Sequence, residues 1–595
     1  MVEKDFFSEV IETDVLVVGG GGGGLMAALE AKRKNLDVML ISKGQVYKSG
    51  ATPIAGADLT LDGKSLHDLG FPGVPTDSKD KFFNDIVTQG FYLNNQDLVE
   101  LYVENAPIVI KELLDLGLKV NYTEERAIDT DGINITYRLF REAKNIGVNF
   151  LDNVMLVELL TNEGKISGGI AFNVLTGEFL IIKAKSIIIA TGGWHKAYKF
   201  NAGSLDLSGD GQAIAFRAGA YLGNMEFVTF CANILYWPPM WKGNLYTYIL
   251  HMIIDGKLLN SNGENIFQNY DEEIVKIGST TEWNKCFISN ISYKEIKEGR
   301  GSLHGGIYFP IDKNKLDQIE KEVGKYYPNW KYKGIDFSEL RNLILNGKYL
   351  EVGPGAEYFE GGIVIDEKCS TTVPGLYAAG EVTMSLFGAN RVAAATTEAL
   401  VEGKIAGYYA SEYALKNNFN SLNELQLQRF KNKINDLLKR RDGIRTSTIL
   451  KDIQNMAWEK MGPIRNSSGI QEFINFINKI KNYDFNKIYI ESDSKKYNKS
   501  LINYFEIENM ITVLELSAKA ALYRKESRGV HYREDFPYTD NINWLKEIIF
   551  VNDKDIKLLE RPVILKRLFP PRLIFPYFDM MKILMKSHSD TPGSH

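Results

Sequence analysis

Short apolar runs and a helical pattern alternate near the start of the chain. Residues 15–18 (VLVV) form a β-branched run that suits a buried parallel strand. Residues 25–35 (LMAALEAKRKN) are rich in strong helix formers, and a second apolar run ends in LISKG at residues 40–44. The pattern predicts a strand–helix–strand unit.

The turn between the first strand and the helix is made of glycine. Gly19, Gly21 and Gly24 satisfy the spacing GxGxxG. Glycine lets the backbone turn tightly and approach a pyrophosphate, and the start of a helix offers free N–H groups. Because the motif follows a strand and opens a helix, it predicts a dinucleotide site. The second strand ends in Ser42 and Lys43, where many such folds carry an acid for the ribose.

Two further strand patterns lie far downstream. Residues 185–193 (KSIIIATGG) and 373–382 (VPGLYAAGEV) are apolar runs that end in glycine-rich turns. Their wide spacing implies a nucleotide domain interrupted by insertions. Glu381 follows the last strand and is placed to accept a hydrogen bond from a ribityl or ribose hydroxyl. This position favours FAD over NAD as the dinucleotide.

Helical patterns dominate the region after residue 420. Residues 422–441 and 508–527 both show apolar residues at helical spacing. They predict a separate helical domain in the last third of the chain.

Bulk composition excludes several classes of protein. The chain has 595 residues, of which 44% are hydrophobic and 24% charged, enough for about three to four domains. The net charge of −5 gives no indication of a basic surface that would bind nucleic acid. No apolar run reaches ~18 residues and the first residues are acidic, so we expect a cytoplasmic protein without a transmembrane segment. The three cysteines, Cys231, Cys286 and Cys369, are far apart, so this chain alone cannot hold an iron–sulfur cluster.

Several motifs occur in an order that resembles a known family. VVGGGGGGLMAA, ISK, ATGGWHKAYKFN, SGDGQAIAFRAGA, EGRGSLHGGIY, GLYAAGEV, GANR and RKESRGVHYREDFP follow one another. Over about residues 12–550 the chain resembles the flavoprotein subunits of the succinate dehydrogenase and fumarate reductase family, which includes L-aspartate oxidase and the adenylylsulfate reductase α subunit. The resemblance implies an α/β fold with a split Rossmann-like FAD-binding domain, an inserted α+β capping domain and a C-terminal helical domain. The implied segments are 1–225 and 356–420 for FAD binding, 226–355 for the cap, 421–545 for the helical domain and 546–595 for a tail.

The resemblance also implies the cofactor contacts. Ala51 stands where many members carry a histidine bonded covalently to the flavin, so we expect FAD to be bound non-covalently. Besides the three motif glycines and Glu381, the residues expected at FAD are Ser42, Lys43, Ser49, Gly50, Ala51, Thr52, Ala190, Thr191, Gly192, Asn201, Asp210, Gly380, Arg391 and Thr396.

The residues with which the family binds dicarboxylates are mostly replaced. Arg391 in GANR is retained, while Lys285 falls at the position of an arginine that acts as general acid. Glu357 and Cys231 fall at positions of substrate-binding histidines. Tyr248 and Ile249 stand where the family carries a threonine–glutamate pair, and Phe387 stands where it carries a further histidine. The resemblance therefore implies a catalytic group of Lys285, Arg391, Glu357 and Cys231 in a pocket altered for another substrate.

Each of these residues also has a plainer interpretation. Cys231 can be interpreted as a small buried hydrophobic residue, Lys285 as a surface lysine, and Glu360 as a side chain that faces solvent. His531 suits a structural role at least as well as a catalytic one. The aromatic residues at the start of the cap form either its core or a wall over the flavin, and they are Tyr236, Trp237, Trp241, Tyr246 and Tyr248.

The resemblance thus implies an FAD-dependent oxidoreductase that transfers a hydride between flavin N5 and a small organic substrate. A carboxylate at Glu357 would repel a dicarboxylate, so that substrate is expected to be of another kind. The resemblance also implies that electrons are exchanged with a separate iron–sulfur subunit. The apolar and basic segment 561–588 suits packing on its own chain, docking of a partner subunit or contact with a membrane surface, and of these we expect a subunit interface. Alternatives are an adenylylsulfate-reductase-like flavoprotein and a purely electron-relaying flavoprotein with a degenerate pocket.

Overall fold

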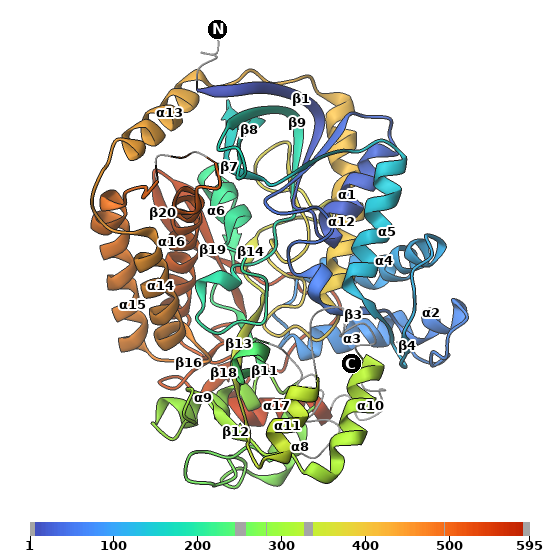
Figure 1. Cartoon of the computed structure of the whole chain (residues 1–595). Coiled ribbons are helices and arrows are strands. Elements are labelled where there is room, and N and C mark those ends of the chain that lie inside the picture. Colours follow the sequence, from blue (N-terminus) through green and yellow to red (C-terminus); the bar gives the residue numbers. More distant parts are fainter. Residues whose placement is uncertain are drawn as a thin grey trace.

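The computed structural model describes residues 6–243, 257–280, 283–326, 337–492, 494 and 496–586. Figure 1 shows the nucleotide-binding sheet in the upper part of the view, the helical domain at the left and the cap at the bottom. Tyr246 and Tyr248, singled out from the sequence, lie outside the described residues, as does Ile249.

The strand–helix–strand unit at the start of the chain lies at the centre of the largest sheet. β1 (Phe7–Val18) pairs in parallel with β2 (Val38–Ser42) on one side and with β9 (Phe179–Ile189) on the other. The order β6–β2–β1–β9–β8–β7 continues with β6 (Asn149–Asp152), β8 (Lys165–Asn173) and β7 (Val154–Asn162).

A strand from far downstream completes this sheet. β15 (Leu376–Ala378) pairs in parallel with the last residues of β9, Ile187 to Ile189, while β8 occupies the first half of the same edge. The split nucleotide domain predicted from the sequence is therefore confirmed.

Two helices from distant parts of the chain pack closely on this sheet. α1 (Gly22–Lys32) lies against α12 (Ala395–Lys416), and a Cβ atom added at Gly403 would lie 2.4 Å from the carbonyl oxygen of Gly23. The close approach holds the start of α1 next to the segment that follows β15. The remaining early elements are α2 (Gly63–Asp68), α3 (Lys79–Gln89), α4 (Gln96–Asp115), α5 (Gly132–Asn145), β3 (Gly56–Thr60), β4 (Tyr122–Thr123) and β5 (Ala127–Asp131).

The cap leaves the nucleotide domain and returns to it along one pair of strands. β11 (Val228–Trp237) pairs antiparallel with β13 (Leu350–Phe359), from Val228 opposite Phe359 to Trp237 opposite Glu351. This pairing brings residues 231 and 357 of the chain into one sheet. The other cap elements are β12 (Ile307–Phe309), α8 (Glu272–Gly278), α9 (Ile288–Lys297), α10 (Leu316–Tyr326) and α11 (Phe337–Leu345).

The predicted helical domain is confirmed. α16 (Lys499–Tyr523) is buried along most of its length and packs against α14 and α15 and against α6 of the nucleotide domain. The helices are α13 (Glu424–Leu438), α14 (Thr446–Met461), α15 (Ser467–Lys479) and α6 (Asp210–Arg217).

The C-terminal segment folds onto its own chain. β19 (Lys546–Asp553) pairs with β20 (Asp555–Pro562) and with β10 (Leu222–Gly223), which also pairs with β14 (Gly362–Ile363). α17 (Tyr577–Lys586) packs against α8 of the cap, in the lower part of Figure 1. The role of this segment as a subunit interface stays a prediction. Among the helices of the described residues, none is both long enough and apolar enough to cross a bilayer.

Candidate flavin and substrate site

The turn at the end of β1, residues 19–24, consists of glycine backbone without side chains, and we call it the glycine cradle. Gly19 has φ +119°, and a Cβ atom there would lie 2.1 Å from the carbonyl oxygen of Ala190. A Cβ atom at Gly24 would lie 1.9 Å from the carbonyl oxygen of Gly19. α1 starts at Gly22 without a side-chain cap at Gly21. The N–H of Gly22 donates to the Thr52 hydroxyl at 3.2 Å, so the N–H groups that can face an anion belong to the next residues of the first turn.

Most of the predicted cofactor residues gather at one edge of the sheet. They follow the carboxyl ends of β1, β2, β9 and β15, where open α/β sheets bind their ligands. By segment they are Gly19, Gly21 and Gly24; Ser42, Lys43, Ser49, Gly50, Ala51 and Thr52; Ala190, Thr191 and Gly192; and Gly380, Glu381, Arg391 and Thr396. Asn201 and Asp210 lie on the chain that continues from β9, with Asp210 at the start of α6.

Glu381 carries a carboxyl oxygen suited to a cofactor hydroxyl. Its Oε2 accepts a hydrogen bond from the Gly193 N–H at 3.1 Å, whereas its buried Oε1 has no hydrogen-bond partner within the described residues. Burial raises the pKa of Glu381 to about 8. A buried acceptor without a partner is costly, so a hydroxyl donor at this point fits the site. The residues present therefore fit a bound FAD.

Lys43 and Asp210 belong to a cluster that joins two domains. The Lys43 ammonium lies 2.8 Å from Asp210 Oδ2 and 3.1 Å from Glu506 Oε1 on α16. Asn509, also on α16, donates to Asp210 Oδ1 at 2.8 Å. The two carboxylates outweigh burial and raise the pKa of Lys43. In the structure these two predicted cofactor residues hold the nucleotide domain against the helical domain.

Arg391 and Glu357 meet where the nucleotide domain faces the cap. Arg391 lies between β15 and α12, and Glu357 lies on β13. Arg391 Nη2 is 3.4 Å from Glu357 Oε1, and the two side chains keep exposed fractions of 17% and 21%. Glu357 Oε2 is buried without a hydrogen-bond partner among the described residues. The guanidinium also lies 5.2 Å from the ring centre of Tyr358.

Lys285 reaches the same place from the cap. Its Nζ donates to the carbonyl oxygen of Arg391 at 2.9 Å, so it is not a free surface lysine. Burial, followed by the nearby Arg391 charge, lowers the pKa of Lys285 to about 8, although Glu357 opposes the shift. The structure thus brings Lys285, Arg391 and Glu357 together.

Glu360 does not face solvent. Its exposed fraction is 0%, and its Oε1 accepts a hydrogen bond from the Thr229 hydroxyl. Burial raises the pKa of Glu360 to about 7, and the Thr229 hydrogen bond opposes that shift. The solvent-facing interpretation of Glu360 is therefore wrong, because β11 and the nucleotide domain enclose the end of β13.

Cys231 behaves as a small buried residue. Its Sγ donates to the carbonyl oxygen of Gly355 at 3.1 Å, and burial raises the pKa of the thiol well above its ordinary value. The thiol therefore stays protonated at neutral pH. Its predicted place among the catalytic residues remains a prediction.

The described aromatic residues at the start of the cap pack among protein atoms. The ring of Tyr236 stacks on Phe200 at 3.8 Å, and its hydroxyl donates to the carbonyl oxygen of Pro354 at 2.6 Å. Trp241 is buried, and Trp237 stacks on His304 at 5.7 Å between ring centres. These contacts favour the cap core over a wall facing the flavin.

Sequence reasoning missed a buried carboxylate close to Arg391. Tyr358 donates its hydroxyl to Glu398 on α12, and the Ser385 hydroxyl donates to the other oxygen of Glu398 at 2.6 Å. Burial raises the pKa of Glu398 to about 7. The sequence signal that could have led to Glu398 was its partner Tyr358, which lies between Glu357 and Glu360.

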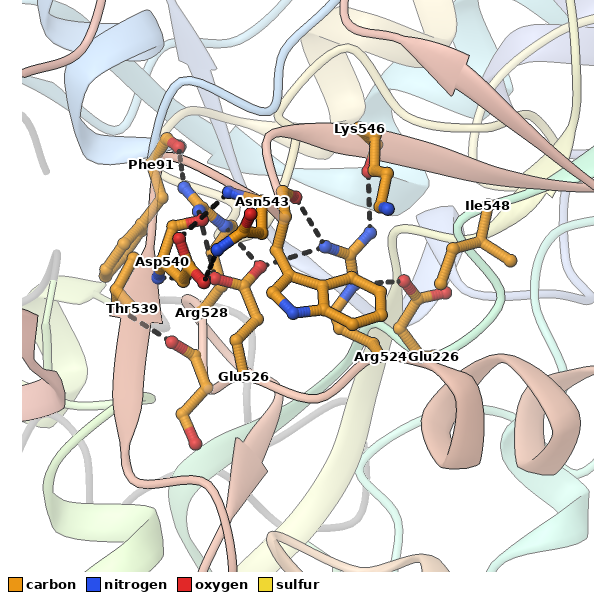
Figure 2. A network of polar contacts seen from close by, with 12 residues as sticks. Phe91, Glu226, Arg524, Glu526, Arg528, Thr539, Asp540, Asn543, Lys546 and Ile548 are labelled. Carbon is orange, nitrogen blue, oxygen red and sulfur yellow. Dashed lines mark hydrogen bonds and ion pairs between the residues drawn. The ribbon is translucent and has the colours of Figure 1, made fainter. Parts of the chain in front are cut away.

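A network of buried charges lies beneath the start of the cap. Figure 2 shows Arg524 between two carboxylates, Glu226 Oε1 at 2.6 Å and Glu526 Oε1 at 2.9 Å. Arg528 contacts Glu526 at 2.8 Å and donates to the carbonyl oxygen of Phe91, also at 2.8 Å. All four charged side chains are fully buried. Because Glu226 lies just before β11, the network fixes the base of the cap.

His531 sits near this network in a structural environment. Its Nδ1 lies 3.0 Å from Arg465 Nη1, and its ring packs against Phe227. Burial and the surrounding arginines lower the pKa of His531 well below its ordinary value. A neutral, enclosed imidazole favours the structural interpretation.

Comparison with known proteins extends over nearly the whole chain. Residues 14–397 match the family described as FAD binding domain, and residues 450–573 match that described as fumarate reductase flavoprotein C-term. An FAD-dependent oxidoreductase described as uncharacterized, from Methanocaldococcus jannaschii, is 33% identical over 91% of this chain and 97% of that protein. One subunit of the fumarate reductase (CoM/CoB) from Methanothermobacter marburgensis is 30% identical over 91% of this chain and 97% of that protein.

A solved structure shows the same architecture. The Escherichia coli quinol fumarate reductase superposes with a TM-score of 0.80 at 26% identity, over 95% of this chain and 98% of that one.

Proposed function

Since this chain belongs to the succinate dehydrogenase and fumarate reductase flavoprotein family and is an FAD-dependent oxidoreductase, we propose that its substrate is a small organic compound other than a plain dicarboxylate. The observation that carries the proposal is the ion pair between Arg391 and Glu357.

The pair changes the charge that a substrate meets. Glu357 already neutralises the guanidinium that a substrate carboxylate would need. A second carboxylate ~4 Å from Glu357 would be repelled by about 4 kcal/mol at an effective dielectric of 20. The pKa of Lys285, the other cation of the site, is lowered to about 8, so this side chain begins to lose its charge near neutral pH. The site therefore suits one anionic or carbonyl group better than two.

FAD, when bound, supplies a flavin ring that exchanges a hydride with a substrate carbon. The chain would hold it with the glycine cradle and with Oε1 of Glu381, which accepts no hydrogen bond among the described residues and lies 3.6 Å from the His195 ring nitrogen. Arg391 would orient the polar end of the substrate and stabilise charge that develops there. Lys285 would move the proton, because a group whose pKa is near neutrality serves as donor in one direction and acceptor in the other.

The attachment of FAD is proposed to be non-covalent. Ala51 lies just before the turn Thr52–Ile54 and carries only a methyl group. A methyl group offers no nucleophile to the flavin.

Electrons are proposed to reach a separate iron–sulfur subunit. The three cysteines of the chain are buried and unpaired, and within the described residues no group of potential ligands is placed to hold a metal. The relative from Methanothermobacter marburgensis is itself named as one subunit of its enzyme.

A second candidate is an electron-relaying flavoprotein without a substrate of its own. The Arg391–Glu357 pair favours it, because an arginine neutralised by its own chain no longer needs a ligand. An adenylylsulfate-reductase-like activity is less well supported, since an anionic nucleotide requires several cations and the site offers Arg391 and Lys285.

One experiment separates these possibilities. The FAD-loaded protein is reduced without oxygen, and flavin reoxidation is followed after mixing with fumarate, with an unsaturated monocarboxylate and with its amide. We expect a singly charged or neutral compound to reoxidise the flavin faster than fumarate does. Reoxidation by fumarate at ~10 s⁻¹, the general enzyme median, would contradict the proposal. No reoxidation by any compound would favour the electron-relaying flavoprotein.

A further inference from the structure

We infer that His195 is a positioning residue for Glu357. Its ring N–H holds the carbonyl group of Glu357 and so fixes a β-bulge, from which the Glu357 carboxylate reaches Arg391. The inference rests on the proposed function, because the Arg391–Glu357 pair is what we propose selects the substrate. His195 would act through Glu357 and would not touch the substrate.

Glu357 is the extra residue at an irregularity in the pairing of β11 with β13. Thr229 lies opposite Tyr358, and the next residue of β11, Phe230, lies opposite Ala356. Glu357 therefore has no residue opposite it on β11. Such a bulge takes the extra residue out of the regular ladder and changes the direction of its side chain. The bulged residue needs a hydrogen-bond partner from outside the strand pair.

The chain around residue 200 supplies that partner on the other side of β13. Ala356 donates its N–H to the carbonyl oxygen of Phe200 at 3.0 Å and accepts from the N–H of Ala202 at 2.9 Å. One residue further on, a side chain takes over, because Nε2 of His195 lies 2.7 Å from the carbonyl oxygen of Glu357. His195 thus continues the backbone contacts at the point where the strand is bulged.

The hydrogen of the imidazole ring belongs on Nε2. A carbonyl oxygen can only accept, so Nε2 of His195 must donate to Glu357. The other ring nitrogen, Nδ1, is buried and has no hydrogen-bond partner within the described residues, and a buried nitrogen without an acceptor is least costly when it carries no hydrogen. Burial also lowers the pKa of His195 to about 4, so the ring is neutral near pH 7 and carries a single N–H.

Neighbouring groups hold the ring in place. A Cβ atom added at Gly203 would lie 2.1 Å from Cδ2 of His195, so the ring fills the space beside that glycine. Phe359 packs edge-on against the ring, with 4.9 Å between the ring centres. A buried group fixed on two sides can set the position of the carbonyl group to which it donates.

The same ring nitrogen also lies next to the expected cofactor site. Nε2 is 3.6 Å from Oε1 of Glu381, the oxygen that accepts no hydrogen bond among the described residues. A hydroxyl group of bound FAD that donates to this oxygen would leave the His195 N–H to the Glu357 carbonyl alone. Loading of FAD is therefore expected to tighten the bulge and the ion pair that it presents.

The position of the ring hydrogen can be read in the wild-type protein without any substrate. FAD-loaded protein is prepared with histidine labelled isotopically at Nε2 in one sample and at Nδ1 in another, and the ring N–H signals are recorded by NMR. The chain has 7 histidines, and the signal of His195 is the one that His195→Gln removes. We expect an N–H signal from Nε2 throughout the neutral pH range. A signal from Nδ1, or none from Nε2, would overturn the inference.

Hydrogen exchange tests whether His195 fixes the bulge. The backbone amides of residues 355–361 should exchange about fivefold faster in His195→Leu than in the wild type, since one ordinary hydrogen bond is worth about that factor. His195→Gln keeps an N–H donor near the position of Nε2 and should restore slow exchange. FAD loading should slow the exchange more in the wild type than in His195→Leu. Equal exchange in the wild type and His195→Leu would mean that the ring does not hold the strand, which contradicts the inference.

Malonate binding to the FAD-loaded protein tests whether the bulge sets the ion pair. In His195→Leu the loosened Glu357 should release Arg391, so this dicarboxylate should bind about fivefold more tightly than to the wild type. In a Glu357→Gln background the same change should have no further effect, because the group that His195 positions is already neutral. His195→Gln should bind malonate as the wild type does. Tighter binding in Glu357→Gln but not in His195→Leu would show that His195 does not position the pair.

A failure of the proposed function gives a different pattern. If Glu357→Gln itself leaves malonate binding unchanged, the ion pair does not select the substrate and the proposed function fails. The ring hydrogen of His195 and the exchange of β13 would still decide whether His195 fixes the bulge.

Discussion

The guanidinium of Arg391 lies 3.4 Å from the carboxylate of Glu357, so the main cation of the site is paired within its own chain. Glu357 lies near the end of β13, where the chain returns from the cap, and Arg391 lies between β15 and α12. Any anionic ligand must compete with Glu357 for the same positive charge.

Removing that competitor should open the site to dicarboxylates. In Glu357→Gln we expect a dicarboxylate such as malonate to bind at least tenfold more tightly, because a repulsion of up to about 4 kcal/mol is lost. The measurement is a titration of the flavin absorbance spectrum with malonate. Glu357→Asp keeps the charge and is the matched control. Equal dissociation constants for wild type and Glu357→Gln would rule out the ion pair as a determinant of specificity.

The flavin should separate from the protein on denaturation. Ala51 offers no nucleophile, so acid precipitation is expected to leave all of the FAD in the supernatant. The measurement is the flavin absorbance of the supernatant and of the redissolved pellet. Flavin that remains in the pellet would contradict non-covalent binding.

The glycine cradle should be required for FAD. In Gly19→Ala the new Cβ atom would lie 2.1 Å from a backbone carbonyl oxygen, so the turn must shift and FAD content should fall sharply. Gly164→Ala is the control, since Gly164 also has a positive φ of +74° but faces open space away from the motif. The ratio of bound flavin to protein gives the result. Comparable flavin content in the two variants would place the pyrophosphate elsewhere.

The pH dependence of turnover should report Lys285. Its pKa is lowered to about 8, so the ammonium that donates the proton is lost as pH rises through 8. The rate of substrate reduction should therefore fall above that pH, and the opposite reaction should become faster. Lys285→Arg keeps its charge to much higher pH, so the fall near pH 8 should disappear. A fall that persists in Lys285→Arg would assign it to another group.

The buried network in Figure 2 should carry much of the stability of the cap base. Arg524→Ala leaves Glu226 buried without its cation, which is expected to cost about 3–5 kcal/mol. Arg300→Ala removes pairs with Glu295 and Glu298 near the surface, and about 1 kcal/mol or less is expected. Denaturant unfolding of the FAD-loaded variants compares the two. Similar midpoints for both would show that the network is not a stabilising element.

The sequence was most informative where one local rule determines a structure. The GxGxxG spacing and its flanking strand and helix predicted the cradle, and the strand before Glu381 predicted the completed sheet. Glu360 was different, because its burial depends on Thr229, which lies 131 residues earlier and meets it only through the pairing of β11 with β13. The stack of Tyr236 on Phe200 likewise depends on packing between elements. Such contacts leave no periodic pattern in the chain.

The last described helix ties the cap to the rest of the protein. The Tyr577 hydroxyl donates to the carbonyl oxygen of Gly529 at 2.5 Å and lies 3.3 Å from the carbonyl oxygen of Cys286, the neighbour of Lys285. Lys582 forms a further ion pair with Asp271 of the cap at 3.1 Å. A cap that swings away from the flavin must either break these contacts or carry the helix with it. α17 therefore couples the position of the cap to that of the segment around Gly529.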